Sequence, residues 1–506
     1  MNEDHDRYLL GIDIGTTGAK CTVYDTGGCM VGHAYQEYPM IHPHEGWTEQ
    51  DPMCWWNAVI KNLRQCFDEQ KIDAGRIVAV SVSCTNAVTI VDEEGEPLYN
   101  AIGHHDLRAE RQVGWLKENV GEELIFSITA NRLAGGTFAL SNLRWMIDNH
   151  PELMHKAHKF LVPSGYIIHK LTGVFSINRP RASLTLLADI NTGQWSDVIV
   201  KKSQIPERLL PDIYASTDIV GCITKGAAVI TGLKEGTPVT AGCLDTVVAT
   251  TGSGAITAGD VAITLGSCGR LCYISDKPIR DKRALNCASP FDGLYTVILS
   301  TDNAGISLRW FRDVFGGVVE EKAKLQGKNI YDYFNELAED TKPGAGGIIY
   351  LPYLSGEKAP IWDSRTRGLF FGIGLESDYG CFVRAVMEGV AFSLKDCMET
   401  LGVDSRIKNP IPLGGGIANS VVWCRIIADV LQHPIIQLKN NETETLGDMI
   451  IAGLSIHENG ITREFGRVLS GQGNIIWPDS SNRRVYEEQF KKYKDIYENT
   501  KRLYWN

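Results

Sequence analysis

A strand–turn–strand pattern that occurs twice is the feature of this sequence that most constrains its fold. In residues 8–25 an apolar strand carries Asp13 near its end, passes through a turn rich in Gly and Thr, and leaves as a second strand. Residues 260–274 repeat this order, with a Gly/Ser turn between a strand of residues typical of β-structure and a second, outgoing strand. Two copies of one unit predict two similar domains that face each other, residues 1–243 and residues 244–506.

The rest of the chain alternates between helix and strand. Apolar residues recur with helical spacing in residues 52–69, 106–118, 139–149, 304–315, 377–400, 420–431 and 485–502. Short runs typical of strands lie between them at residues 77–84, 347–351 and 434–438. This alternation predicts the α/β class.

Composition and charge exclude several classes of protein. The chain has 506 residues, and 50 Lys and Arg against 61 Asp and Glu give a net charge of −11, which disfavours a nucleic-acid binder with its usual basic stripe. No run of about 18 apolar residues occurs that could span a membrane. Residues 1–6 are acidic and polar, unlike a secretory signal, so we expect a cytoplasmic protein.

The 13 cysteines are spread singly along the chain, without a CxxC pair. We therefore expect buried free thiols rather than disulfides or a structural zinc site. The close histidine pairs, His42 with His44 and His104 with His105, do not by themselves indicate a metal, because spacing alone is unspecific.

Residues 13–20 form the first candidate site. A tight turn of Gly and Thr lets backbone N–H groups and the hydroxyls of Thr16 and Thr17 converge on one anion, so the turn can hold a phosphate. Asp13 at the mouth of the turn would repel a phosphate directly, but it fits if a hydrated Mg²⁺ lies between them. An ordinary β-hairpin with an incidental aspartate explains the same residues. The sequence has no GxxxxGK[ST] pattern, which excludes a Walker-type nucleotide site.

Two later segments are further candidates. Asp245 follows the apolar strand at residues 237–241, and a carboxylate at the end of a strand can accept a proton from an alcohol. The common alternative is an aspartate that caps the following helix. Glycines at positions 414–416 let a flat ring approach the backbone, and Asn419 can hydrogen-bond a purine edge. A flexible entry to the next helix explains this segment equally well.

These segments together resemble the FGGY family of carbohydrate kinases, which has the actin/hexokinase (ribonuclease H-like) fold. Residues 8–33 are similar to the family's first phosphate motif, and residues 351–363 to its most distinctive stretch. The similarity continues, in the family's order, through residues 307–313, 367–373, 384–393, 414–430 and 486–497. It implies two actin/hexokinase-like domains with a central cleft, and transfer of the γ-phosphate of ATP to a sugar hydroxyl.

The resemblance implies a role for each matching residue. Asp13 would hold the water shell of Mg²⁺, and Asp245 would be the general base that takes the proton of the attacking hydroxyl. The residues implied to bind the nucleotide are Thr16, Thr17, Lys20, Gly266, Ser267, Gly305, Gly415, Gly416 and Asn419. The residues implied to bind the substrate are Asn86, His104, Asp106, Arg108 and Asp245.

The sugar side departs from the family's pattern. His104 stands where the family usually has Trp, and Arg181 stands where many members have Asp. We expect a pentulose as substrate, because the overall organisation and residues 351–363 resemble the xylulokinase and gluconokinase-like branch of the family more than the glycerol kinases. A carboxylate bound to Arg108 or Arg181 would instead favour a sugar acid such as gluconate. A polyol such as erythritol or glycerol stays open, as does a sensor that binds ATP and sugar without catalysis.

The partners implied by the resemblance are small molecules: ATP with Mg²⁺, and a sugar or polyol. His104 and His105 either read sugar hydroxyls or are simply exposed, and no spacing rule decides between these roles. We expect neither a nucleic acid nor a membrane as partner. Dimers are usual in families of this type, so a homodimer is the candidate assembly.

Overall fold

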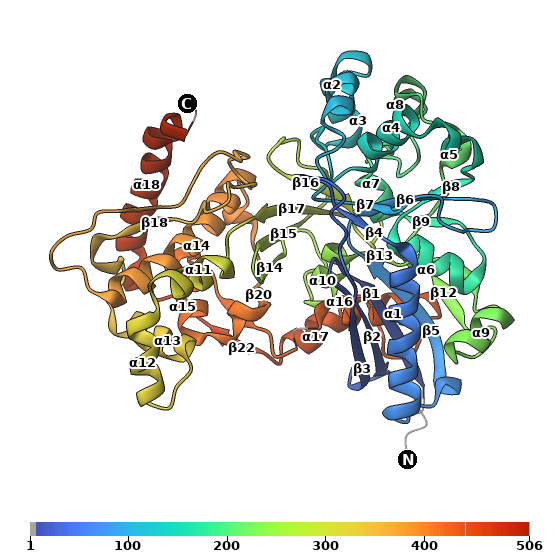
Figure 1. The fold of residues 1–506 in the computed structure, drawn as a ribbon. Coiled ribbons are helices and arrows are strands. Elements are labelled where there is room, and N and C mark those ends of the chain that lie inside the picture. The colour runs from blue at the N-terminus through green and yellow to red at the C-terminus, as the bar shows by residue number, and fades with distance from the viewer. Residues whose placement is uncertain (1–6, 441, 505–506) are drawn as a thin grey trace. The chain divides into compact units, whose positions relative to one another are not determined.

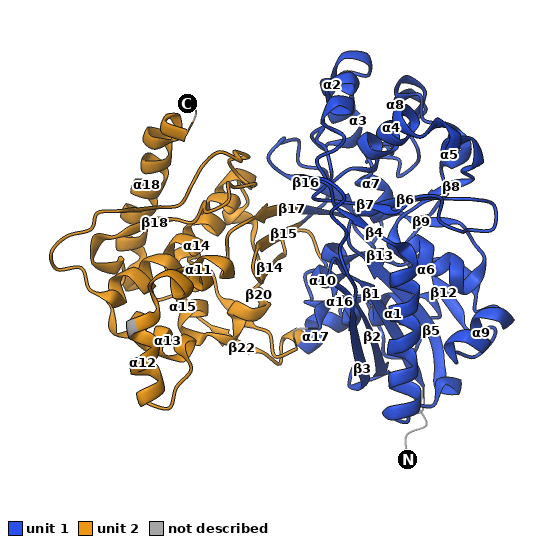
Figure 2. Cartoon of the chain, viewed as in Figure 1, with its two compact units in different colours: residues 1–256, 274–297, 442–469 blue, residues 257–273, 298–441, 470–506 orange. Residues whose placement is uncertain are grey.

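The computed structural model describes residues 7–440 and 442–504, which form two compact units (Figure 2). Unit 1 comprises residues 1–256, 274–297 and 442–469, and unit 2 comprises residues 257–273, 298–441 and 470–506. Residues 1–6, on which the prediction of a missing secretory signal depends, lie outside the described residues.

Each unit consists of three segments of the chain, so the units are not divided by one boundary at residue 243. The chain returns to unit 1 late in the sequence. Helix α16 (Thr443–Ser455) packs against strands β1 (Tyr8–Ile14) and β5 (Ile77–Cys84). The apolar face of α16 belongs to the same buried cluster as Leu9. Burial of this face, rather than continuity of the chain, therefore decides which unit the helix joins.

The main sheet of unit 1 has the strand order β11-β12-β5-β1-β2-β3, and β13 also pairs with β5. The strands not yet defined are β2 (Gly18–Asp25), β3 (Met30–Glu37), β11 (Ile219–Cys222), β12 (Pro238–Thr240) and β13 (Cys243–Leu244). β1 runs antiparallel to β2, which confirms the predicted strand–turn–strand unit at the start of the chain, and β2 runs antiparallel to β3. β1 runs parallel to β5 and is buried along almost its whole length, which explains its nearly unbroken apolar sequence.

Helices cover both faces of this sheet. On one face α1 (Pro52–Arg64) lies along β2 and β3, close to Cys21, which is paired with Ile12 (Figure 1). On the other face α16 contacts the neighbouring residue Gly11, since successive residues of a strand point to opposite faces. A Cβ at Gly11 would lie 2.5 Å from the carbonyl oxygen of Thr445, so a glycine is needed for this close approach.

Smaller elements complete unit 1. A four-stranded sheet has the order β4-β7-β6-β8, and β9 pairs with β10. These strands are β4 (Glu49–Gln50), β6 (Ala87–Val91), β7 (Ala101–Gly103), β8 (Lys159–Leu161), β9 (Ser176–Asn178) and β10 (Asp212–Tyr214), and β16 (Leu285–Ala288) follows later. The helices are α2 (Glu110–Asn119), α3 (Glu122–Thr129), α4 (Ala139–Asn149), α5 (Pro151–Lys156), α6 (Pro163–Thr172), α7 (Arg179–Ser183), α8 (Asp197–Ser203), α9 (Lys225–Thr231) and α10 (Asp245–Gly252). The segment after β7 carries His104, Asp106 and Arg108.

Unit 2 is built on the second strand–turn–strand pattern. β14 (Val261–Leu265) pairs antiparallel with β15 (Gly269–Ser275), as the sequence predicts, and parallel with β20 (Ile411–Gly414). The remaining strands of this part of the chain are β17 (Tyr295–Thr301), β18 (Ile349–Leu351), β19 (Leu369–Phe371), β21 (Ile435–Gln437) and β22 (Asn474–Ile476). The helices are α11 (Gly305–Phe315), α12 (Gly317–Leu325), α13 (Ile330–Asp340), α14 (Tyr379–Leu401), α15 (Val421–Leu431) and α18 (Arg483–Thr500), whereas all but the last residue of α17 (Phe465–Ser470) belongs to unit 1. Helices alternate with strands in both units, which confirms the predicted α/β class.

One predicted helix begins later than expected. The pattern predicted a helix over residues 106–118, but α2 begins at Glu110. The Asp106 carboxylate accepts from the backbone N–H of Thr48 across 2.6 Å and from the Arg108 side chain across 2.8 Å. These contacts hold the residues before α2 in turns, because a helix there would carry Asp106 away from both partners.

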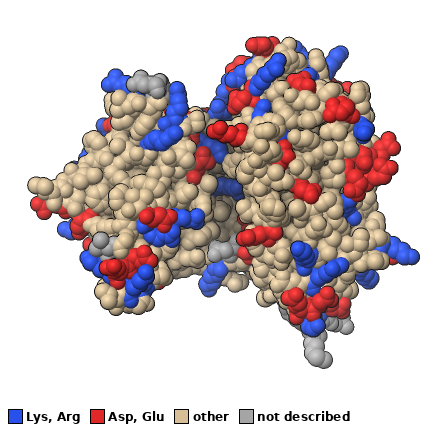
Figure 3. Space-filling view, in the orientation of Figure 1, with Lys and Arg blue, Asp and Glu red and all other residues tan. Residues whose placement is uncertain are grey.

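The structure also bears on membrane spans, disulfides and a basic surface for nucleic acid, which the sequence analysis does not predict. Among the described residues, no helix combines the length and the apolar sequence that crossing a membrane requires. All 13 cysteines are free thiols, and most of them are buried. On the face that Figure 3 shows, acidic and basic side chains of the described residues are interspersed, without one continuous basic stripe.

A buried carboxyl group gives unit 2 a pH-dependent stability. Glu357 is 3% exposed, and its Oε1 accepts from the N–H groups of Asp302 across 2.6 Å and of Lys358 across 2.9 Å. Burial raises the pKa of Glu357 from 4.5 to about 8. Because this pKa is raised on folding, the neutral carboxyl stabilises the fold fully below pH 4.5, and the contribution is lost as the pH rises to about 8.

We expect the free energy of unfolding to fall in this pH range by up to about 1.4 kcal/mol per pH unit through Glu357. Glu357→Gln should remove this part of the fall, because glutamine keeps the acceptor oxygen and cannot ionise. Denaturant unfolding of both proteins at about pH 5 and about pH 8 measures the difference. If the variant follows the wild type at both pH values, Glu357 does not cause the dependence.

Candidate active site

Three parallel strands of unit 1 end at the same level, and the predicted catalytic residues lie at or just beyond these ends. Ile14 of β1 and Leu244 of β13 both lie beside Cys84 of β5. Residues 15–18 follow the first of these ends, and Asp245 follows the last. In α/β proteins, ligands bind outside the carboxyl ends of parallel strands. This edge is therefore the candidate site of unit 1.

The turn after β1 presents N–H groups, while its carbonyl oxygens are already occupied. Tyr38 donates its hydroxyl to the carbonyl of Gly15 across 2.5 Å and its backbone N–H to that of Thr17 across 3.2 Å. The Gln50 side chain donates to the carbonyl of Thr16 across 2.6 Å. Within the described part of the chain, the N–H groups of Thr16 and Thr17 have no acceptor. Such a turn is suited to binding an anion. No local sequence motif indicates that Tyr38 and Gln50 hydrogen-bond to this turn.

Asp13 is buried among other carboxylates. It is 5% exposed, and the Ser83 hydroxyl donates to its Oδ1 across 3.0 Å. Burial, together with the carboxylates of Glu444 and Asp245, raises the pKa of Asp13 to about 7, and the Lys20 ammonium opposes this rise. The site thus holds more negative charge than one ammonium group neutralises.

Lys20 is held by two acidic residues that the sequence analysis did not find. Its Nζ lies 2.9 Å from Glu442 Oε2 and 3.9 Å from Glu444 Oε2. Burial alone would lower the pKa of Lys20, but the carboxylates of Glu444 and Glu442 raise it, so the ammonium stays charged. The sequence predicted only a phosphate contact for Lys20, because Glu442 and Glu444 reach it from the far end of the chain.

These donors fit a hydrated divalent cation better than a metal held directly by the protein. Among the described residues, no group of three or more His, Cys, Asp or Glu is arranged to hold a metal ion. Mg²⁺ usually binds through one or two carboxylates and keeps several waters. The buried Asp13 carboxylate, surrounded by further negative charge, fits that mode of binding.

Asp245 is the first residue of α10 and is half-buried. Its Oδ1 accepts from the backbone N–H of Thr246 across 2.5 Å and from the Thr246 hydroxyl across 3.0 Å. The capping position is Leu244, so Asp245 is not the cap itself, although it lies in the first turn of the helix. The carboxylate is thus held at the end of β13, where a proton acceptor for an alcohol can act.

The predicted sugar-binding residues Asp106 and Arg108 bind each other. Arg108 Nη2 lies 2.8 Å from Asp106 Oδ2, and its Nη1 lies 2.7 Å from Glu49 Oε1. The guanidinium carbon of Arg108 also lies 3.8 Å from the ring centroid of Trp47 and 4.9 Å from that of Trp145. These contacts give both residues an internal role, and their contact with a sugar stays a prediction.

The other predicted sugar-side residues are Asn86 and His104. Asn86 follows the end of β5, and its Oδ1 accepts from the guanidinium of Arg181. His104 is half-buried, with its ring centroid 3.8 Å from that of the exposed His105. A contact of His104 or His105 with a sugar hydroxyl stays a prediction.

The turn between β14 and β15 in unit 2 has the same organisation as the first turn. Ser267 O accepts from the N–H of Ala304 across 3.0 Å, and Gly266 O accepts from the N–H of Gly305 across 2.9 Å. The N–H groups of Ser267 and Cys268 have no acceptor among the residues that the structure describes. A Cβ at Gly305 would lie 2.6 Å from Gly266 O, so glycine is needed there. Each unit therefore carries one turn suited to a phosphate.

A cavity of about 670 Å³ in unit 2 lies beside this second turn. The predicted nucleotide residues that line it are Gly266, Ser267, Gly305, Gly416 and Asn419. The lining residues that the sequence analysis did not assign are Leu308, Arg309, Asn329, Tyr331, Asp332, Asn335, Ile417, Ser420 and Trp423. Gly415 lies behind the cavity with φ of 86°, and a Cβ there would lie 2.6 Å from the carbonyl oxygen of Leu265. Asn329 caps α13, a signal for a helix start but not for a binding site.

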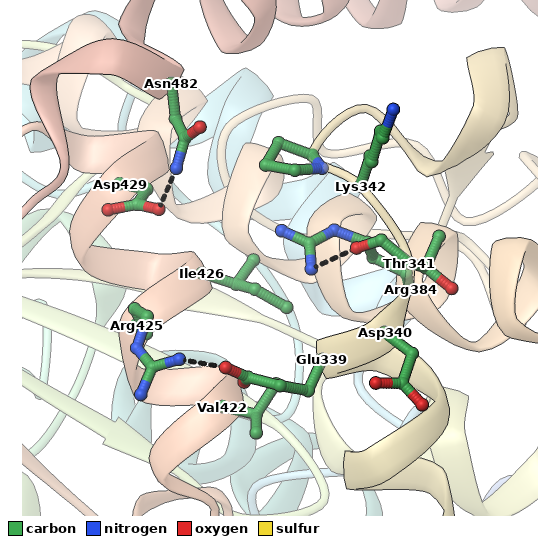
Figure 4. Close-up of a pocket in the computed structure, with 11 residues that line it drawn as sticks. Glu339, Asp340, Thr341, Lys342, Arg384, Val422, Arg425, Ile426, Asp429 and Asn482 are labelled. Carbon is green, nitrogen blue, oxygen red and sulfur yellow. Dashed lines mark hydrogen bonds and ion pairs between the residues drawn. The ribbon is translucent and has the colours of Figure 1, made fainter.

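Figure 4 shows another cavity of unit 2, of about 270 Å³, lined by residues of α13, α14 and α15. Arg425 pairs there with Glu339, and Asn482 donates to Asp429 Oδ2 across 2.9 Å. None of the predicted site residues lines this cavity, so we assign the 670 Å³ cavity as the candidate site of unit 2.

Comparison with known proteins agrees with this geometry. The models of the N-terminal and C-terminal domains of the FGGY family of carbohydrate kinases match residues 8–252 and 261–456. The chain is 29% identical over 503 residues to xylulose kinase of Bacillus subtilis (98% of each chain), and 29% identical over 452 residues to gluconokinase of Bacillus licheniformis (88% and 86%). The structure of a ligand-bound xylulose kinase from Lactobacillus acidophilus superposes with a TM-score of 0.88 at 26% identity, covering 98% of this chain and 99% of that one.

Proposed function

Since this chain belongs to the FGGY family of carbohydrate kinases and has its two-domain fold, we propose that it transfers the γ-phosphate of ATP to a hydroxyl group of a five- or six-carbon sugar or sugar acid. The observation that carries the proposal is the pair of turns whose carbonyl oxygens are occupied and whose N–H groups are open. Phosphoryl transfer depends mainly on positioning and on neutralising charge, which such turns provide.

In the proposed reaction the chain's own residues position the reactants and move one proton. Asp245 accepts the proton of the attacking hydroxyl. The open N–H groups after β1 and β14 donate to phosphate oxygens as negative charge develops there, and Lys20 adds a positive charge beside the first turn. Asp13 would hold the water shell of Mg²⁺, and the ion would supply positive charge that neutralises charge on the phosphates.

The cavity beside the second turn is the proposed adenosine site. No atom lies within 4 Å of the position that a Cβ at Gly416 would take, so a side chain there fits the fold but enters the cavity. We expect Gly416→Leu to raise the KM for ATP about tenfold, which corresponds to about 1.4 kcal/mol, with an unchanged thermal midpoint. Gly317→Leu, which also meets no atom within 4 Å and lies outside the cavity, is the matched control. An unchanged affinity for ATP in Gly416→Leu would mean that the nucleotide binds elsewhere.

Two substrate classes stand out. The similarity to proteins named xylulose kinase supports the pentulose that the sequence predicts. The similarity to a protein named gluconokinase supports a sugar acid, and so does the buried Arg181, whose charge and that of Asp245 both act on Cys84.

The experiment that tests the function is ADP release from Mg-ATP over a panel of candidate acceptors. The panel contains D-xylulose, L-xylulose, D- and L-ribulose, D-gluconate, glycerol, erythritol and L-fuculose, with Asp245→Asn as the blank. One acceptor well above the blank establishes the kinase and names its substrate. A flat panel from a protein that still binds ATP in calorimetry would contradict the proposal and favour a sensor.

A further inference from the structure

Arg181 is a buried cation for which the described residues supply no counter-ion. The residue is 3% exposed, and its Nη1 donates to the neutral amide oxygen of Asn86. Its Nε is buried without an acceptor, and no carboxylate of the described residues forms an ion pair with it. A buried guanidinium group is costly unless it is paired and hydrogen-bonded. The missing partner is therefore expected from a ligand.

Hydrogen bonds of the Asn178 side chain hold the backbone at Arg181 in place. The Asn178 side chain accepts from the backbone N–H of Arg181 across 2.9 Å and thereby caps α7. The same side chain donates to the carbonyl of Ala241 across 3.2 Å, just before β13. Helix α7 is thus attached to the strand that leads to Asp245.

Arg181 also lies in the neighbourhood of the proposed general base. Burial raises the pKa of the Cys84 thiol to about 11, the positive charge of Arg181 opposes this rise, and the negative charge of Asp245 adds to it. Both charges therefore act on one side chain at the end of β5. Asn86, two residues further along, contacts Arg181 directly.

Arg108, the other arginine that the sequence suggested for a carboxylate, already has carboxylate partners within the protein. Arg108 pairs with Asp106 and with Glu49, at 2.8 and 2.7 Å. It therefore has no need of an anionic ligand. Of the two arginines, only Arg181 lacks a carboxylate in the described structure.

We propose, on the basis of the proposed function, that Arg181 binds the carboxylate of the substrate and that the substrate is an aldonic acid of five or six carbons. The planar guanidinium matches a carboxylate with two parallel hydrogen bonds. The phosphates have their own donors in the two turns. An aldonate can place its carboxylate on Arg181 and one of its hydroxyls at Asp245.

The test compares acceptors that differ at one carbon, which is a carboxylate in the acid and a hydroxymethyl group in the polyol. ADP release from Mg-ATP is measured with D-gluconate against D-glucitol, with D-xylonate against xylitol, and with D-xylulose. We expect the wild type to prefer each acid over its polyol by about 10²-fold or more in kcat/KM, because a buried polar group left unpaired discriminates strongly. Arg181→Met should lower kcat/KM for the acids by about 10²–10³-fold and hardly change it for the polyols. Arg181→Lys should restore part of the preference.

Arg179→Met on the same helix is the matched control, since Arg179 pairs with the exposed Asp292. It should change the ratio between acid and polyol less than about twofold. If Arg181→Met does not fold, the thermal midpoint of the wild type without ATP gives an independent answer. D-gluconate should raise that midpoint and D-glucitol should not.

The outcomes separate this inference from the proposed function. ADP release with D-xylulose but not with the aldonates overturns the inference and leaves the kinase in place. An equal loss for acids and polyols in Arg181→Met gives Arg181 a merely structural role. A panel without ADP release contradicts the kinase, and the thermal shift with D-gluconate then decides alone whether Arg181 binds a carboxylate.

Discussion

Replacement of Asp245 by asparagine is expected to lower kcat by about 10²–10⁴-fold, the contribution typical of a general base. Asparagine keeps the size of the side chain and the Oδ1 that accepts from Thr246 N–H and Thr246 Oγ1. The variant therefore keeps its fold but cannot take the proton of the attacking hydroxyl. Steady-state ADP release at saturating substrate measures kcat, and calorimetry measures the affinity for ATP, which should stay within about threefold.

Two further results complete this test. Thr246→Val removes the hydroxyl that donates to Asp245 and leaves the carboxylate in place, so it should cost far less than the loss of the base. If Asp245→Asn keeps more than about a tenth of the wild-type kcat, the proton is accepted by another group.

Gly447→Ala is expected to destabilise unit 1 by about 1–3 kcal/mol, the usual effect of overpacking. A Cβ at Gly447 would lie 2.0 Å from the carbonyl oxygen of Val248 in α10 and 2.7 Å from Val248 Cγ2. Across the same contact, a Cβ at Gly252 would lie 2.1 Å from Thr443 O. Because the closest clashing atoms belong to the backbone, an added Cβ would force α10 and α16 apart. Denaturant unfolding measures the loss of stability.

The same substitution should also lower activity, because α10 begins with Asp245 and α16 carries Glu444. Gly114→Ala is the control: it lies within α2 and meets no atom within 4 Å. It should leave activity unchanged and stabilise the protein by up to about 1 kcal/mol, since alanine favours the helix more than glycine. Equal stability of Gly447→Ala and the wild type would mean that the two helices are not in contact.

Local patterns in the sequence were sufficient for the strands, the turns and the candidate groups at their ends. The Gly/Thr turn after Asp13 and the Gly/Ser turn at Gly266 each lie between two strands in the structure, as predicted. Helix boundaries were predicted to within a few residues wherever local periodicity set them. The start of α2 was not, because a contact between Asp106 and Thr48 decides it.

Which charges are neutralised was decided only by tertiary structure. Asp106 and Arg108 look from the sequence like a pair that could bind sugar, but Glu49 of β4, distant in the chain, forms an ion pair with Arg108. Arg181 looks similar in sequence and receives only the amide of Asn86. A residue's own sequence neighbours do not show whether it has a partner, because the partner comes from elsewhere in the chain.

The sequence by itself determined the α/β class, the two strand–turn–strand units, and Asp13 and Asp245 as candidates, because strand and turn preferences act between residues close in the chain. The tertiary structure decided that α16 returns to the first sheet and brings Glu444 toward Lys20, and Asp448 to within 2.6 Å of the Ser83 hydroxyl. Burial of the apolar face of α16 drives that return, and burial also raises the pKa of Asp13. Such effects depend on which surfaces exclude water, and that is fixed only when distant segments pack.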